Sequence, residues 1–91
     1  MKISYDPAKR RKTLAERGLD FEDAARVFDG PRYTVQDDRF DYGEVRWQTY
    51  GLLDGRLVTV VWTARSEVRH IISMRKCNDR EKEEFGRELG S

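Results

Sequence analysis

The sequence predicts an α+β fold in which an N-terminal pair of helices packs on an antiparallel β-sheet and one further helix follows the sheet. Two observations support this prediction. Residues 7–30 combine helix-capping residues with apolar side chains at helical spacing, whereas residues 45–76 alternate in the two-residue period of strands around an Asp-Gly turn. The chain has 91 residues, which is room for one hydrophobic core, so we expect a single domain over residues 1–91.

The N-terminal segment predicts a short strand and a capped helix. Ile3 and Tyr5 alternate with polar residues as in a strand. Asp6 is a favourable N-cap, and Pro7 suits the first helical turn, where its missing N–H costs nothing. The helix is expected to run from Pro7 to about Arg17 and to end at Gly18 in a left-handed conformation.

A second helix is expected to begin after Asp20 and to stop at Gly30-Pro31. Its helical spacing predicts one apolar stripe, formed by Phe21, Ala24, Ala25 and Phe28.

The middle of the chain predicts three strands. A short strand around Tyr33 and Val35 precedes an acidic loop. Two longer strands flank Asp54-Gly55, a dipeptide typical of two-residue hairpin turns. This turn places Leu53 opposite Arg56, Trp47 opposite Trp62, and Glu44 opposite Arg65. The expected buried face carries Val45, Trp47, Val58, Val60, Trp62 and Ala64.

A further strand is expected over about Val68–Lys76, with a three-residue turn before it. To keep its apolar set with the buried face, the strand places Val68, His70, Ile72 and Met74 inward. The opposite face then receives Arg69, Ile71, Ser73 and Arg75.

The C-terminal segment predicts a last helix that extends to about Leu89. Asn78 and Glu81 have the spacing of a capping box. Only Phe85 and Leu89 can anchor this helix, so loose docking is expected.

Composition limits the classes of partner. Lys and Arg total 18 against 17 acidic residues, a net charge of +1, so nucleic-acid binding would need a focused basic patch. The single cysteine, Cys77, excludes an intramolecular disulfide and favours a reducing compartment. The N-terminus lacks the apolar segment of a signal peptide, and no apolar run reaches membrane-spanning length. We therefore expect a cytoplasmic protein.

The polar face of the predicted sheet is the main candidate site. Guanidinium groups suit bidentate phosphate recognition, and RNA cleavage by the ribose 2′-OH needs an activating group, cations at the phosphate and a proton source. Arginines can stabilise the phosphate without a metal, Glu44 beside Arg65 can activate the hydroxyl, and Tyr50 can stack on a base or donate a proton. A solvated sheet face with weak ion pairs is the simpler alternative. The candidate residues are Glu44, Arg46, Tyr50, Arg65, Arg69, Ser73 and Arg75.

The sole histidine and an acidic segment are two further candidate sites. His70, the sole histidine, could act as a general base, but its position between apolar residues predicts that it faces inward as a hydrogen-bonded, partly buried histidine. The acidic group Asp37, Asp38, Asp41 and Glu44 could bind Mg²⁺, but its spacing matches no calcium-loop pattern and is typical of a solvated loop. No metal or other cofactor is expected.

Several segments together resemble BrnT toxins over nearly the whole chain. In the first half they are Tyr5-Asp6-Pro7-Ala8-Lys9, Gly18-Leu19-Asp20-Phe21-Glu22-Asp23-Ala24 and Val27-Phe28. In the second half they are Gly43-Glu44-Val45-Arg46-Trp47, Gly51, Thr63-Ala64-Arg65 and Arg69-His70-Ile71-Ile72-Ser73-Met74-Arg75-Lys76. The chain departs from the usual pattern at Thr13 and Glu16-Arg17, where members often carry an Asn and a Lys-His pair, so no role of that histidine transfers.

This resemblance implies a ribonuclease toxin of a type II toxin–antitoxin system with a RelE-like fold, in which helices pack on a curved antiparallel sheet. The implied activity is metal-independent endoribonuclease cleavage that inhibits translation and growth. The implied partners are RNA and a small DNA-binding, BrnA-like antitoxin that neutralises the toxin in a hetero-oligomer. By matching position, the resemblance implies catalytic roles for Glu44, Arg46, Arg65 and Arg75 and RNA contacts by Arg69, with Tyr50 and Ser73 added from the face assignment. The alternative is a non-catalytic module that binds RNA or protein through the same face.

Overall fold

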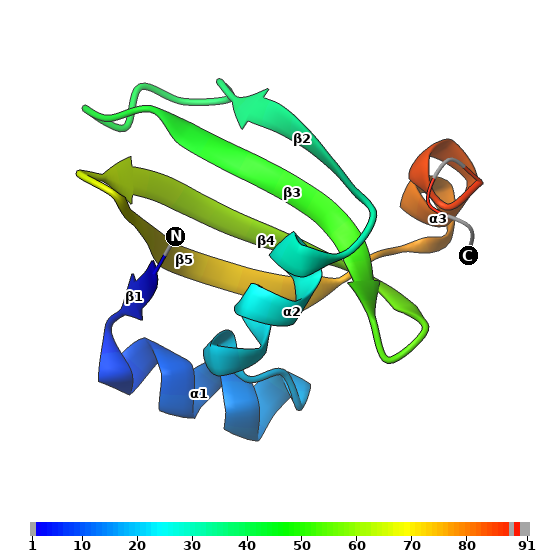
Figure 1. Ribbon diagram of the computed structural model, residues 1–91, viewed down its shortest axis with the longest axis horizontal. Coiled ribbons are helices and arrows are strands. Elements are labelled where there is room, and N and C mark those ends of the chain that lie inside the picture. Colours follow the sequence, from blue (N-terminus) through cyan, green and yellow to red (C-terminus); the bar gives the residue numbers. More distant parts are fainter. Residues whose placement is uncertain (1, 88, 90–91) are drawn as a thin grey trace.

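A five-stranded sheet with three α-helices forms the protein in a computed structural model that describes residues 2–87 and 89 (Figure 1). The strands lie in the order β1-β5-β4-β3-β2. The elements in chain order are β1 (Lys2–Tyr5), α1 (Pro7–Arg17), a 3₁₀ turn η1 (Phe21–Asp23), α2 (Ala24–Asp29), β2 (Arg32–Asp37), β3 (Arg46–Leu53), β4 (Arg56–Arg65), β5 (Val68–Lys76) and α3 (Asp79–Phe85). The α+β class is confirmed.

The sheet is mixed, so the prediction of an antiparallel sheet is wrong for its first strand. β2 to β5 pair in antiparallel fashion along the chain, whereas β1 pairs with β5 in parallel. A parallel pair needs a long connection, and here α1, η1, α2 and the other three strands lie between β1 and β5 in sequence. The result places β1 at the edge beside β5, with Ser4 opposite His70.

The N-terminal helix begins and ends where its capping residues predict. The side chain of Asp6 accepts a hydrogen bond from the N–H of Ala8, Pro7 occupies the first turn, and Gly18 closes the helix with φ of 67°. The second predicted helix is divided in two, because Asp20 caps the 3₁₀ turn η1 and α2 follows only from Ala24. The guanidinium of Arg10 pairs with Asp20 at 2.8 Å and ties α1 to η1.

The main core lies between α2, η1 and one face of the sheet. Phe21, Ala24 and Val27 are fully buried there against Val60 and Ile71. Phe28 meets Trp62 edge to face at 5.6 Å between ring centroids, and Trp62 lies 6.3 Å from Trp47 across the hairpin. The predicted pairing of the two tryptophans is confirmed. We call this side of the sheet the core face.

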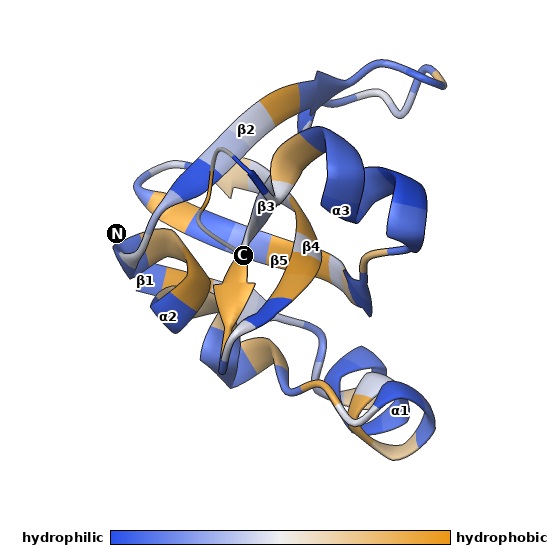
Figure 2. Ribbon diagram, turned by 90° about the vertical axis from the view of Figure 1, so that its right-hand side faces the viewer, coloured by the Kyte–Doolittle hydropathy of each residue, from blue (hydrophilic) through white to orange (hydrophobic). Residues whose placement is uncertain are grey.

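The opposite side of the sheet is partly covered by α3. Figure 2 shows α2 and α3 on opposite sides of the sheet. Phe85 of α3 stacks on Tyr50 at 4.1 Å between ring centroids, and Leu89 is buried beside Leu57 and Cys77. Both predicted anchors are therefore used. The helix ends at Phe85 in place of Leu89; of the residues after it, 88, 90 and 91 lie outside the described residues.

The Asp-Gly hairpin has the predicted register. Leu53 pairs with Arg56 and Trp47 with Trp62. Asp54 and Gly55 have φ of 51° and 77°, which is the left-handed backbone that such a two-residue turn requires.

The turn between β4 and β5 differs from the prediction and changes one face of β5. Ser66 and Glu67 form a two-residue turn, so Arg65 pairs with Val68, and a β-bulge at Ile72 absorbs one residue. Beyond the bulge, residues 73–76 keep the predicted faces. Before it the faces are exchanged, so residues 69 and 71 lie on the core face and residues 68 and 70 on the opposite face.

Within the part of the chain that the structure describes, no helix is long and apolar enough to cross a membrane.

Substitution of Gly51 tests how closely α2 packs on β3. A Cβ at this position would lie 2.6 Å from Cγ1 of Val27 and 3.4 Å from the carbonyl oxygen of Pro31. Gly51→Ala is expected to lower the free energy of unfolding by about 1–3 kcal/mol, as overpacking does, measured by urea denaturation.

Gly30→Ala is the matched control, because its Cβ would meet only a carbonyl oxygen at 3.8 Å. In a Val27→Ala background the cost of Gly51→Ala should shrink, since the opposing methyl group is gone. Equal costs in the two backgrounds would contradict this account of the packing.

Candidate functional site

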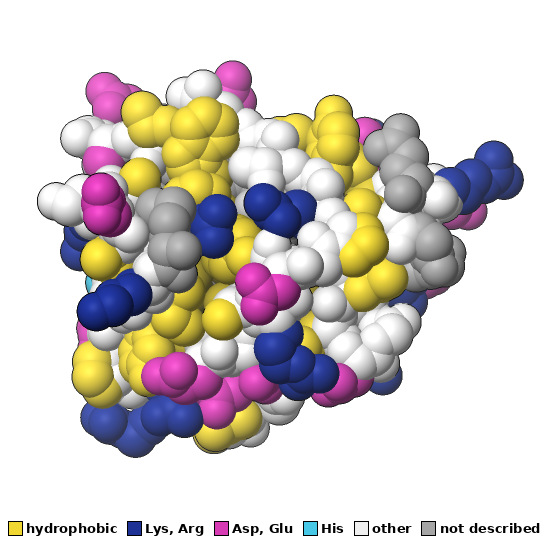
Figure 3. Space-filling view, in the orientation of Figure 1, with side chains coloured by type: hydrophobic (Ala, Val, Ile, Leu, Met, Phe, Trp, Pro, Cys, Tyr) yellow, Lys and Arg dark blue, Asp and Glu magenta, His cyan; other side chains and the backbone are white. Residues whose placement is uncertain are grey.

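The candidate site lies on the side of the sheet away from α2, where polar side chains from four strands come together. We call this surface the polar face; it lies beside the end covered by α3. Its members are Ser4, Arg46, Gln48, Val61, Thr63, Arg65, His70 and Ser73, with Glu44 from the loop before β3 and Arg75 next to α3. The other side of the molecule, seen in Figure 3, carries basic, acidic and hydrophobic side chains in mixed order.

Glu44 lies between two arginines of the polar face. Its carboxylate oxygens are 3.8 Å from Nε of Arg46 and 3.8 Å from an Nη of Arg65. These separations are ion pairs without hydrogen bonds, so the guanidinium donors are not used up by the carboxylate. The Arg65 side chain is 56% exposed, which leaves it open to a ligand anion. The predicted contact of Glu44 with Arg65 is confirmed, although Glu44 precedes the strand.

Arg46 is held in place by the loop that carries Glu44. Its guanidinium lies 4.0 Å from the centroid of the Tyr42 ring, a cation–π contact, and its Nε is buried without a hydrogen-bond partner among the described residues. An arginine in such an environment has little freedom to rotate, so its terminal nitrogens are presented in one direction.

Asp37 organises this loop. Its carboxylate receives two hydrogen bonds from the side chain of Arg39, at 2.8 and 3.0 Å, one from the Arg39 backbone N–H at 3.4 Å and one from the hydroxyl of Tyr42 at 3.3 Å. The side chain is 1% exposed. Hydrogen bonds from Arg39, helped by Gln48, lower the pKa of Asp37 to about 2. Asp37 is therefore a buried residue that fixes the loop at the end of β2. The prediction that it belongs to a solvated acidic loop is wrong.

Arg75 is on the predicted face, but a carboxylate of α3 occupies it. Two of its nitrogens donate to the two oxygens of Glu81, each at 2.7 Å. Glu81 also forms the predicted capping box with Asn78. The Arg75 guanidinium lowers the pKa of Glu81, so the pair stays ionised near neutral pH.

Tyr50 is on the polar side of β3 but is not free to stack on a base. The residue is 6% exposed and its ring stacks on Phe85, while its hydroxyl donates to Oε1 of Gln48 at 2.9 Å. Burial, aided by the charge of Glu81, raises the pKa of Tyr50. The residue supports α3 and links it to the network of Asp37.

Ser73 is placed as predicted, at the border of the polar face. It lies opposite Val61 and is half-buried. Together with Ile72 it lines a hollow against α1, whose walls also include Lys9, Lys12, Thr13, Glu16 and Arg17. The hollow gives the polar face a basic border.

Arg69 is not on the polar face, and its predicted placement there is wrong. The exchange of faces before the bulge turns it to the core face, where its guanidinium lies 4.1 Å from the Phe28 ring centroid and 5.3 Å from that of Trp62. Burial, with the nearby charge of Arg32, lowers the pKa of Arg69. Arg69 therefore covers the edge of the core and cannot contact a ligand on the polar face.

His70 lies on the polar face, so the prediction that it faces inward is wrong. It lies opposite Thr63 on the polar face, half-exposed, with Nδ1 at 2.9 Å from Oγ of Ser4. Its polar-face position depends on the two-residue turn Ser66-Glu67 and on the bulge. Neither has a marker in the sequence, because no glycine or Asn-Gly pair stands at the turn.

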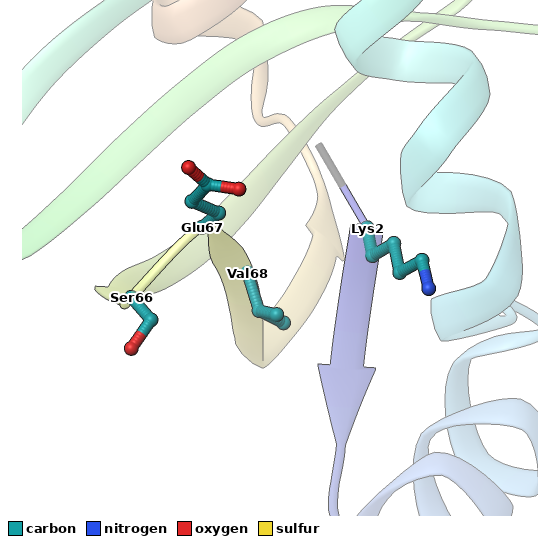
Figure 4. A pocket seen from close by; sticks show the side chains of 4 residues that line it. All are labelled: Lys2, Ser66, Glu67 and Val68. Carbon is teal, nitrogen blue, oxygen red and sulfur yellow. The ribbon is translucent and has the colours of Figure 1, made fainter.

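A shallow hollow adjoins the polar face at its β1 edge (Figure 4). It is lined by Lys2, Ser66, Glu67 and Val68, and the charged ends of Lys2 and Glu67 point away from each other. Since Lys2 and Val68 share the side of Ser4 and His70, this hollow extends the polar face.

No group of three His, Cys, Asp or Glu side chains is arranged as metal ligands among residues 2–87 and 89. The polar face carries the arginines Arg46, Arg65 and Arg75, whose guanidinium groups are suited to phosphate groups.

An α+β domain with arginines and one carboxylate on an accessible sheet face belongs to the class of proteins whose surface is suited to bind phosphate groups. Comparison with known families is more specific: the model of the family described as the BrnT ribonuclease toxin of type II toxin–antitoxin systems matches residues 5–81. The chain belongs to this family, which implies an RNA target and an antitoxin partner. No curated protein matches the chain.

The ionisation of Asp37 is expected to contribute to stability. Its pKa of about 2 lies below the ordinary value of 3.8, so the contribution is present above about pH 4 and is lost as the pH falls towards 2. Asp37→Asn should be less stable than wild type at neutral pH, and the difference should shrink on acidification, measured by urea unfolding across this range.

Asp38→Asn is the control, since Asp38 is exposed at the next position. A difference between wild type and Asp37→Asn that is the same at neutral pH and near pH 2 would show that the charge of Asp37 is not its source.

Proposed function

We propose that this protein is a metal-independent endoribonuclease that cleaves RNA on its polar face and thereby inhibits translation and growth. The observation that carries the proposal is the placement of Glu44 between Arg46 and Arg65, at 3.8 Å from each, on an accessible sheet face. The family relationship supports ribonuclease activity. In this proposal the fold is related to that of RelE toxins. The partner is a BrnA-like, DNA-binding antitoxin that neutralises the toxin in the cytoplasm.

The reaction would use the substrate's own 2′-hydroxyl as nucleophile. As the 2′-oxygen attacks phosphorus, negative charge grows on the non-bridging oxygens, and fixed cations that meet this charge lower the barrier. Arg65 has the exposure to reach those oxygens, and Arg46 has a fixed orientation given by Tyr42. Glu44 holds the two guanidinium groups together against their mutual repulsion, and it borders the position of the attacking hydroxyl.

Arg75 and Ser73 would contact the RNA on the α3 side of the cleaved bond. Arg75 shares its charge with Glu81, so its contribution to the phosphate should be smaller than that of Arg65. Ser73, at the basic border with α1, can donate its hydroxyl to a flanking phosphate oxygen.

Cleavage in the presence of a chelator tests the absence of a metal requirement. Purified protein is expected to cut RNA in excess EDTA as fast as in Mg²⁺ and to leave 2′,3′-cyclic phosphate and 5′-hydroxyl ends, as attack by the 2′-hydroxyl requires. Intact RNA in EDTA, with cleavage restored by Mg²⁺, would replace this mechanism by a metal-dependent one.

Single arginine substitutions test the assignment of the site. Arg65→Ala and Arg46→Ala should each lower the cleavage rate about 10²–10³-fold, the loss typical of one removed oxyanion donor, and Arg75→Ala should lower it less. Arg65→Ala and Arg46→Ala should also relieve the growth inhibition caused by induced expression of the protein.

Arg56→Ala is the matched control, because this exposed arginine lies at the Asp-Gly turn on the core-face side. Growth inhibition that persists after loss of both Arg46 and Arg65 would favour the alternative of a non-catalytic binding module. The same conclusion would follow if wild type and variants alike left RNA intact.

A further inference from the structure

We propose that, in the RNA cleavage proposed above, His70 is the base that accepts the proton of the attacking 2′-hydroxyl. The starting observation is its position. The β-bulge at Ile72 moves His70 from the core face to the polar face, opposite Thr63 on β4. Among the described residues it is the one side chain of the polar face whose ordinary pKa lies near neutrality.

The imidazole is held at one nitrogen and leaves the other available. Nδ1 lies 2.9 Å from Oγ of Ser4 on β1, while Nε2 has no hydrogen-bond partner among residues 2–87 and 89. When Nδ1–H donates to Ser4, Nε2 is the accepting nitrogen, the tautomer that a general base needs. Ser4 thus acts as a positioning residue for the ring.

The charges around His70 favour the neutral imidazole. Burial lowers its pKa, and the cations Arg65 on β4 and Lys9 on α1 lower it further. Glu44 before β3 and Asp6 at the start of α1 act in the opposite direction. The lowered pKa favours the unprotonated imidazole at neutral pH, the form that can accept a proton. His70 pairs with Thr63, and Arg65 lies two residues further along β4 on the same face, 3.8 Å from Glu44.

The step conserves atoms and charge. The 2′-oxygen gives its proton to Nε2 and forms a bond to phosphorus, while the bond from phosphorus to the 5′-oxygen breaks. The 5′-oxygen leaves with a proton taken from solvent water, and the imidazolium later returns its own proton to solvent. The products are a 2′,3′-cyclic phosphate and a 5′-hydroxyl, and no oxidant, reductant or metal takes part. Glu44 remains ion-paired with the arginines throughout.

Kinetics of a short RNA as a function of pH give the first test. For wild type, kcat/KM should rise as the pH increases through the pKa of His70, below 6.5, and then level off. His70→Gln should lower kcat/KM by about 10²–10⁴-fold and abolish this pH-dependent rise, since glutamine cannot accept the proton. Ser4→Ala should cause a smaller loss and keep the rise.

Nuclear magnetic resonance of the same residue gives a second test that does not depend on activity. The chain has one histidine, so untagged protein shows a single imidazole signal whose titration reports His70 directly. Binding of 2′-O-methyl RNA, which cannot be cleaved, should raise its pKa because a phosphate lies beside the ring. The affinity of His70→Gln for this RNA should stay within a few-fold of wild type, which shows that the variant is folded.

The outcomes separate this proposal from the function on which it rests. A wild-type protein that cleaves no RNA at any pH would overturn the proposed function itself. If the wild-type protein cleaves RNA and His70→Gln shows the same pH profile, the role of His70 is overturned and the proposed function stands. An imidazole signal that is unchanged by bound RNA would overturn the role of His70 as well.

Discussion

Two fully buried side chains on β5, Ile71 and Met74, constrain the whole sheet. Both pack in the main core, yet they are three residues apart, and a regular strand would turn them to opposite faces. The β-bulge at Ile72 resolves this conflict by adding one residue between them. It allows β5 to pair with β4 over its full length after a tight two-residue turn, and it decides which side chains reach the polar face.

The bulge and the loop before β3 cooperate to build the site. The bulge brings His70 to the polar face and removes Arg69 from it, where a stack on Phe28 compensates part of the cost of burying the guanidinium. The loop, fixed by the buried carboxylate of Asp37, sets Glu44 between two arginines. The carboxylate of Glu44 offsets the repulsion between the guanidinium groups of Arg46 and Arg65.

The two ends of the polar face have different characters. Beside α3 the surface is closed, because Phe85 stacks on Tyr50 and Glu81 occupies Arg75 with two short hydrogen bonds. Towards β1 the charged groups are more exposed, and no carboxylate binds Arg65 at hydrogen-bond distance among the described residues. An anionic polymer would therefore meet its accessible cation near Arg65, and the arginine next to α3 serves mainly to hold that helix in place.

The sequence alone determined the features that depend on neighbouring residues. Asp6 and Gly18 mark the ends of α1, and Asp54-Gly55 fixes the register that sets Trp47 against Trp62, because caps and turns are local conformational preferences. Alternation also placed Arg46, Arg65 and Arg75 correctly. It failed for Arg69 and His70, because a bulge has no local marker here and arises only when distant helices bury Ile71. Tertiary packing, not local preference, therefore decided which of these two residues reaches the site.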